Sequence, residues 1–171
     1  MLTMYYSFIY PYLNYCIHVW GASRKTYLNK VILLQKKAVR IISGADRLAH
    51  TELLFRSLAM LNIDKIYSYN VGLMMFKFHH EKLPLILKKF FTKNCAIHSY
   101  NTRQKYLLHI PRFDKEVGKR SFRLRAAISW NHLLQNLNSL DIRISTFKTH
   151  LKQYLIVHNE SIHESIYTRS S

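Results

Sequence analysis

Positive charge and aromatic rings are interleaved along residues 97–131. Eight basic residues lie between Arg103 and Arg125, against two acidic ones, Asp114 and Glu116. The same segment carries five aromatic residues: Tyr100, Tyr106, Phe113, Phe122 and Trp130. Lysine and arginine neutralise phosphates, and flat rings stack on unpaired bases. The mixture therefore favours binding of RNA or single-stranded DNA.

One group in this segment could contact a base and a phosphate together. Tyr100, Asn101 and Arg103 would supply a stacking ring, an amide for a base edge and a guanidinium for a phosphate. A turn in which Asn101 satisfies the backbone, with Arg103 paired to a carboxylate, is the structural alternative. The scarcity of acids nearby favours binding.

A second group is Lys119–Arg123, which the pattern places at the start of a helix. Backbone N–H groups at a helix N-terminus attract anions. Arg120 and Arg123 would share one face there, where basic side chains oppose the helix dipole and are poorly placed for stability alone. This mismatch favours a phosphate-binding role over a solvated helix start.

A third group lies on the helix predicted for residues 24–42. Leu28, Val39 and other apolar side chains recur on one face at a period of 3.6 residues, and Ser43-Gly44 ends the pattern. Lys36, Lys37 and Arg40 fall on the opposite side of the helix, where they either bind phosphates or form a solvated face. All predicted nucleic-acid contacts are Lys36, Lys37, Arg40, Tyr100, Asn101, Arg103, Lys105, Arg112, Lys119, Arg120 and Arg123.

The overall charge agrees with a polyanionic partner. The 171 residues carry a formal net charge of +17 and a pI of about 10.0. An acidic membrane surface and a merely solvated basic face are the competing interpretations. Residues 1–23 carry no charged side chain, but Pro11, Asn14, His18 and five tyrosines favour a buried helix over a membrane segment. No membrane partner is expected. The sequence predicts an intracellular location, and its basic clusters are compatible with entry into the nucleus.

No catalytic or metal centre is expected. Cys16 and Cys95 are far apart and form no zinc motif or disulfide framework. The histidines, including His79-His80, lack zinc spacing with suitable partners. Each aspartate stands alone, so no acid pair is available to hold two catalytic metal ions. The sequence predicts no cofactor and no enzymatic activity of the chain on its own.

The predicted fold is mainly α, a helical bundle with a small irregular or β-hairpin insertion near 98–118. Four glycines and three prolines are few for a turn-rich β fold. Ser23, Thr51 and Ser145 are candidate helix caps, and Trp20, Trp130 and Met74-Met75 are expected to pack in the core. The predicted helices span 3–19, 24–42, 51–58, 62–82, 85–91, 119–134 and 145–157. The predicted domains are a helical region 1–91, a basic loop with C-terminal helices 92–157, and a polar tail 158–171.

An ordered series of short motifs resembles a known family. The pieces, in chain order, are Tyr5-Tyr6, Ile9–Cys16, Trp20-Gly21, Leu34–Ile42, His50-Thr51, Leu54-Phe55, Met75–Lys77, His98–Arg103, Arg120–Phe122, Trp130-Asn131 and Phe147-Lys148. Together they are similar to the region just past the polymerase core in non-LTR retrotransposon reverse transcriptases, with jockey-like LINE elements the closest type. The resemblance covers about residues 5–156.

This resemblance implies a thumb and the segment that follows it, which hold template RNA and primer against an active site built elsewhere. The paired aspartates of the polymerase palm are missing here, so the resemblance implies a non-catalytic C-terminal fragment. The missing polymerase core would then be a further partner. The alternative is an orphaned or oligomerising protein-interaction remnant that exposes residues 1–23.

Overall fold

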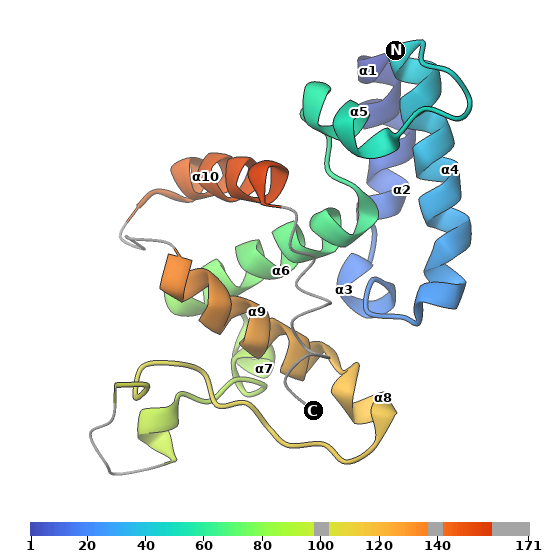
Figure 1. Ribbon diagram of the computed structural model, residues 1–171. Coiled ribbons are helices and arrows are strands. Elements are labelled where there is room, and N and C mark those ends of the chain that lie inside the picture. The colour runs from blue at the N-terminus through green and yellow to red at the C-terminus, as the bar shows by residue number, and fades with distance from the viewer. Residues whose placement is uncertain (98–102, 137–141, 159–171) are drawn as a thin grey trace. The chain divides into compact units, whose positions relative to one another are not determined.

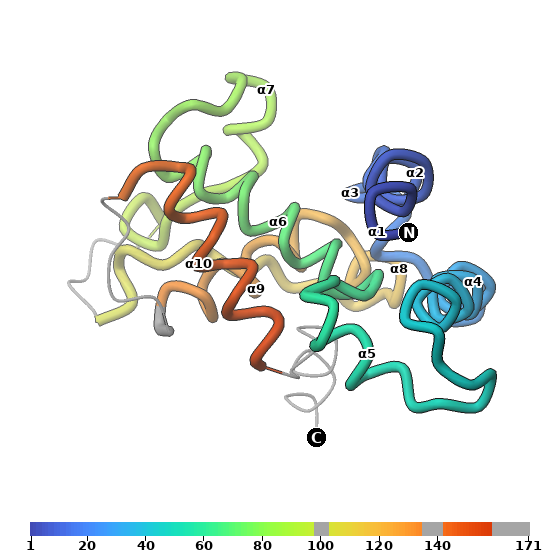
Figure 2. Tube along the Cα trace, turned by 90° about the horizontal axis from the view of Figure 1, so that it is seen from above, coloured from blue at the N-terminus to red at the C-terminus, as the bar shows by residue number. Residues whose placement is uncertain are grey.

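The computed structural model describes residues 1–97, 103–136 and 142–158, and these residues are almost entirely helical or irregular (Figures 1 and 2). The predicted mainly α class is confirmed. The one β-type pairing in the described part is an isolated antiparallel bridge between Lys93 and Leu108. The chain forms two compact units, Met1–Asn70 with Thr149–Ser171, and Val71–Lys148. The predicted division at 91/92 is a different partition of the chain and stays a prediction.

The first unit is built from short helices followed by one long one. Its elements are α1 (Leu2–Met4), the π-helical turn η1 (Tyr5–Ile9), α2 (Tyr10–Asn14), α3 (Ile17–Trp20), α4 (Lys25–Ser43), α5 (Thr51–Ser57) and the first half of α6 (Ile63–His79). The part of α10 (Ile144–Val157) from Thr149 onward also belongs to this unit. Figure 1 shows α1 and α2 running beside α4. Tyr5, Val39, Phe55 and Met60 form the buried cluster between these elements.

The single buried helix predicted for residues 3–19 is wrong in two respects. It breaks at Tyr15–Cys16, where Cys16 adopts the left-handed conformation with φ 50°. Trp20 Nε1 donates to the Tyr15 carbonyl at 2.7 Å, so a side chain replaces the lost helical hydrogen bond. The segment is also mostly exposed, because Tyr5 and Ile17 are the buried side chains of residues 1–20. Trp20 itself is half-buried.

The long helix α4 agrees closely with its prediction. Leu28 and Val39 are buried, and Gly44 ends the helix with φ 64°, a left-handed conformation that glycine adopts without a steric penalty. The predicted cap is wrong, since Arg24 occupies the N-cap position. Gln35 is also buried, which the apolar pattern did not indicate. Its Nε2 donates to the Tyr5 hydroxyl at 2.9 Å and to the Leu61 carbonyl at 3.0 Å.

Other predicted helices are shorter or shifted by a residue or more. Thr51 is the first residue of α5 rather than its cap, and Ser145 lies inside α10. The helix predicted for 85–91 is α7 (Leu85–Lys88). At the start of α6, the Asn62 side chain accepts a hydrogen bond from Lys65 N at 2.9 Å. This contact is an N-cap of the kind that asparagine favours.

The second unit packs the rest of α6 with α9 (Phe122–Asn136) and the start of α10. Its core is aromatic: the rings of Phe76 and Phe147 stack with centroids 4.2 Å apart, and Trp130 lies 6.5 Å from Phe147. Burial of Trp130 and Met75 confirms two of the predicted core positions, whereas Met74 is half-buried. Between α7 and α9 lie the short helices η2 (Asn94–Ala96) and α8 (Glu116–Lys119).

Gly21 shows why the Trp20-Gly21 pair needs glycine. A β-carbon there would lie 2.6 Å from the Ile17 carbonyl oxygen and 2.6 Å from Tyr67 Cδ2. We expect Gly21→Ala to lower the free energy of unfolding by ~1–3 kcal/mol, the usual cost of overpacking. Urea denaturation of the full chain measures this difference. Gly44→Asn is the matched control, because position 44 is open and asparagine tolerates its left-handed backbone. Equal stability of wild type and Gly21→Ala would contradict the packing seen at this site.

Within the described residues, no helix is both long enough and apolar enough to cross a membrane.

Candidate nucleic-acid interface

The basic segment of the second unit is tied to the preceding loop by backbone hydrogen bonds. Beside the Lys93–Leu108 bridge, Asn94 N donates to the Leu107 carbonyl at 2.9 Å, and His109 N donates to the Thr92 carbonyl at 2.8 Å. Cys95 N donates to the Lys105 carbonyl at 2.9 Å. Residues 103–110 are therefore held against residues 92–97 without forming a regular hairpin.

The Asn131 side chain of α9 holds the same loop through hydrogen bonds to the backbone of Leu108. Its Nδ2 donates to the Leu108 carbonyl and its Oδ1 accepts from Leu108 N, both at 2.9 Å. The amide thus pairs with Leu108 as a neighbouring strand would. Both residues are buried. Asn131 follows Trp130 in the chain, so the same turn of α9 supplies a core ring and the loop clamp.

The pinned loop turns cations and a ring toward solvent. Lys93 and Arg103 are exposed, Lys105 is half-buried, and Tyr106 is 69 % exposed. The Lys105 ammonium lies 4.7 Å from the centroid of the Tyr106 ring, a cation–π contact. We call Lys93, Arg103, Lys105 and Tyr106 the basic platform. It combines charge for phosphates with a flat surface for a base.

The corner between α8 and α9 carries the remaining predicted contacts, and it departs from the prediction. Lys119 and Arg120 do not begin a helix, since Lys119 ends α8 and α9 starts at Phe122, with Arg120 between them. Lys119 Nζ forms an ion pair with Glu116 Oε1 at 3.0 Å. Arg120 and Arg123 are half-buried and do not share one helix face, while Arg112 is exposed.

One cation of the segment is removed from solvent. Arg125 lies on α9 and is 4 % exposed. Its guanidinium belongs to the interior of the second unit and is not available to a strand at the surface. The predicted site did not include it.

The three α4 cations predicted to contact phosphates, Lys36, Lys37 and Arg40, lie in the first unit and in three different environments. Arg40 Nε donates to the Ala49 carbonyl at 3.0 Å, which commits it to the turn after α4. Lys37 is exposed, and Lys36 is half-buried at the wall of a cavity. The structure therefore does not present them as one phosphate-gripping face. Tyr100 and Asn101 lie outside the described residues.

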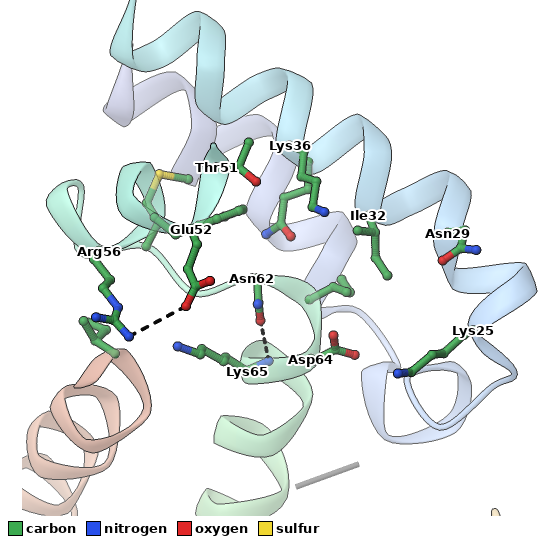
Figure 3. Close-up of a pocket in the computed structure, with 15 residues that line it drawn as sticks. Lys25, Asn29, Ile32, Lys36, Thr51, Glu52, Arg56, Asn62, Asp64 and Lys65 are labelled. Carbon is green, nitrogen blue, oxygen red and sulfur yellow. Dashed lines mark hydrogen bonds and ion pairs between the residues drawn. The ribbon is translucent and has the colours of Figure 1, made fainter. Parts of the chain in front are cut away.

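The cavity beside Lys36 has a volume of about 410 Å³ and lies within the first unit (Figure 3). One wall is the face of α4 that includes Asn29, Ile32 and Gln35. The other wall comes from α5 and the start of α6, including Phe55 and Lys65. Four Lys and Arg side chains and two acids line it: Lys25, Lys36, Arg56 and Lys65, with Glu52 and Asp64.

Charge inside this cavity is partly compensated. Arg56 Nη2 lies 3.7 Å from Glu52 Oε1. Burial lowers the pKa of Lys65 below its usual value, Arg56 lowers it further, and Glu52 acts in the opposite direction. Burial and the neighbouring Arg56 thus both disfavour the charged form of the Lys65 ammonium.

Among residues 1–97, 103–136 and 142–158, no three His, Cys, Asp or Glu residues come close enough together to hold a metal ion. Cys16 and Cys95 are both exposed.

In the sequence Tyr106 stands out only as one of five aromatic residues, and the predicted contacts include neither Tyr106 nor Asn131. Nothing in the local sequence shows that an asparagine 23 residues after Leu108 would pair with it. Comparison of the chain with protein-family models, curated proteins and solved structures finds no match.

Proposed function

We propose that this protein is a non-catalytic nucleic-acid-binding module that holds single-stranded RNA or DNA on its second unit. The observation that supports it best is the pinned basic platform, in which exposed cations and an exposed ring are fixed by Asn131 and by the pairing with residues 92–97. A pre-ordered loop binds a strand at a smaller entropic cost than a flexible one.

The charge of the second unit supports the same role. Residues 71–148 contain fifteen Lys and Arg against four Asp and Glu. Arg103 and Arg112 are exposed, and Arg120 and Arg123 are partly so. Contacts of this kind are mostly electrostatic and weaken steeply with salt, because binding releases counterions from the phosphates.

The resemblance to the region past the polymerase core of LINE-type reverse transcriptases gives the proposal a context. In that context the strand is template RNA or its DNA primer, the polymerase core is a further partner, and the protein works inside the cell, in the nucleus. Catalysis would belong to that partner.

Tyr106 is the stacking residue in this proposal. We expect Tyr106→Leu to weaken binding of a single-stranded oligonucleotide by about tenfold, because stacking on one ring contributes ~1–3 kcal/mol. Fluorescence anisotropy with a labelled oligouridylate measures the affinity. Tyr106→Phe keeps the ring and should bind like wild type. Tyr27→Leu, at an equally exposed ring of the first unit, should also have no effect. Equal weakening by the substitutions at positions 27 and 106 would contradict the assignment.

The experiment that tests the proposal compares two polyanions. The full chain is titrated with labelled single-stranded RNA, and separately with vesicles of phosphatidylserine and phosphatidylcholine, over a series of salt concentrations. The proposal predicts RNA binding whose logarithm falls linearly with the logarithm of salt, by about 0.7 per phosphate contacted. Vesicle binding without RNA binding, or RNA binding insensitive to salt, would refute it.

A second candidate function is supported by the surface of residues 1–20. Phe8, Tyr12, Tyr15 and Val19 are each at least 67 % exposed, an unusual number of large apolar side chains for one short segment. This surface favours self-association of an interaction remnant. Light scattering distinguishes the two: a monomer at micromolar concentration that binds RNA supports the first, and oligomers that do not bind RNA support the second.

A further inference from the structure

The cavity of the first unit has the size and lining of a small-molecule site. Its volume of about 410 Å³ falls in the ~300–1,000 Å³ range of ligand pockets. Apolar side chains and polar groups share its walls, among them Ile32, Phe55 and Met60 with Asn29 and Gln35. Such a mixture suits a ligand with a flat apolar part and a charged group.

The excess of cations in the cavity lining favours a negatively charged group on the ligand. Four cations and two acids line the cavity, and Glu52 is occupied by Arg56. Lys36 comes from α4 and Lys65 from α6, on opposite walls of the cavity (Figure 3). Neither ammonium has a carboxylate within ion-pair distance among the described residues. A phosphate bound in the cavity would offset the Arg56 repulsion that, together with burial, lowers the pKa of Lys65.

Gln35 adds a fixed hydrogen-bonding group. It is 3 % exposed and lines the cavity. Both N–H groups of its amide are occupied, by the Tyr5 hydroxyl and the Leu61 carbonyl. No described residue donates to its side-chain oxygen, so this oxygen is left to accept a hydrogen bond from a ligand. The site therefore favours a ligand that carries an N–H or O–H donor.

We propose that this cavity binds a nucleotide, with its phosphate attracted by the cations of both walls, Lys36 and Lys65, its base packed against Phe55 and Ile32, and an N–H group of the base donating to Gln35. The site is distinct from the basic platform and goes beyond the strand-binding role. Free nucleotides and the 5′-phosphorylated end of a strand present the same chemistry.

Calorimetric titration of the full chain with AMP, adenosine and inorganic phosphate at constant ionic strength tests the proposal. AMP should bind at least about tenfold more tightly than either part alone, because charge-assisted hydrogen bonds and ring packing act together. Purine riboside monophosphate, which lacks the exocyclic amine, should bind about tenfold more weakly than AMP. Phosphate binding as tight as AMP binding would overturn the assignment of a base pocket.

Variants locate the site. Lys36→Ala and Lys65→Ala should each weaken AMP binding by about tenfold. Lys37→Ala is the matched control, since Lys37 is the exposed neighbour on the same helix and does not line the cavity. Equal loss at positions 36 and 37 would overturn the proposal. Thermal unfolding of each variant, compared with the wild type, tests whether the fold is kept.

Two further measurements are needed. The first tests whether this site is independent of the strand-binding residues, and the second tests whether its ligand is a free nucleotide or the end of a strand. Replacing Arg103, Arg120 and Arg123 should leave AMP binding unchanged, so either site can fail without the other; loss of AMP binding would overturn the assignment. Competition by a 5′-phosphorylated tetranucleotide supports a strand end as the occupant, and its absence supports a free nucleotide.

Discussion

Charge reversal of Arg103, Arg120 and Arg123 to glutamate should reduce the affinity for single-stranded RNA by about 100-fold near 0.1 M salt. Each change removes a phosphate contact and adds a repulsive charge. The slope of log affinity against log salt should also become shallower by about 2, the loss of three contacts at roughly 0.7 each. Fluorescence anisotropy across a salt series gives both quantities, and far-UV circular dichroism confirms that the helices remain.

A control with the same change in net charge tells local contacts from long-range attraction. Lys77, Lys82 and Lys89 are exposed cations of the same unit that belong neither to the basic platform nor to the corner between α8 and α9. Their triple change to glutamate should weaken binding only modestly and leave most of the salt slope in place. If both triple variants lose affinity equally, the strand is attracted by overall charge and the assigned residues are wrong.

Asn131→Ala should have the largest effect on stability. It removes two hydrogen bonds at once and leaves Leu108 N and the Leu108 carbonyl buried without their partner. The expected loss in the free energy of unfolding is ~2–4 kcal/mol, as each orphaned buried group costs at least ~1 kcal/mol. RNA affinity should fall as well, because residues 103–110 lose their anchor on α9.

Urea denaturation measures the loss in the free energy of unfolding. Hydrogen exchange at the Leu108 amide measures how far the loop is released from α9. Asn94→Ala is the control, because Asn94 Nδ2 makes a single exposed hydrogen bond to the Gln104 carbonyl at 3.0 Å. It should change stability by less than about 1 kcal/mol. Unchanged exchange at Leu108 in the Asn131 variant would show that the clamp does not hold the loop.

Local patterns predicted the fold class and the better-formed helices. In α4, periodic apolar residues and a following Gly44 were enough, because both signals act within one helix. The break at Cys16 had no such signal. Neither glycine nor proline stands there, and the break is held by the Trp20 indole and by an Asn70–Asn14 hydrogen bond of 2.6 Å that joins residues 56 positions apart.

The candidate site was predictable in its chemistry and less so in its detail. The segment rich in cations was evident from composition, but the exposure of each cation depends on its neighbours. Glu116 lies three residues before Lys119, a spacing that allows an ion pair on a helix and could have been used. Burial of Gln35 and Arg125, by contrast, follows from tertiary packing and breaks the rule that polar side chains face water.

Photo-cross-linking of the full chain to single-stranded RNA that contains 4-thiouridine, followed by mass spectrometry of the peptides, tests the central claim most directly. The account predicts that the cross-links concentrate in residues 103–112 and 119–123, with Tyr106 among them, and that they diminish as salt is raised. Cross-links spread evenly over the exposed lysines and arginines of both units, or confined to the first unit, would contradict it.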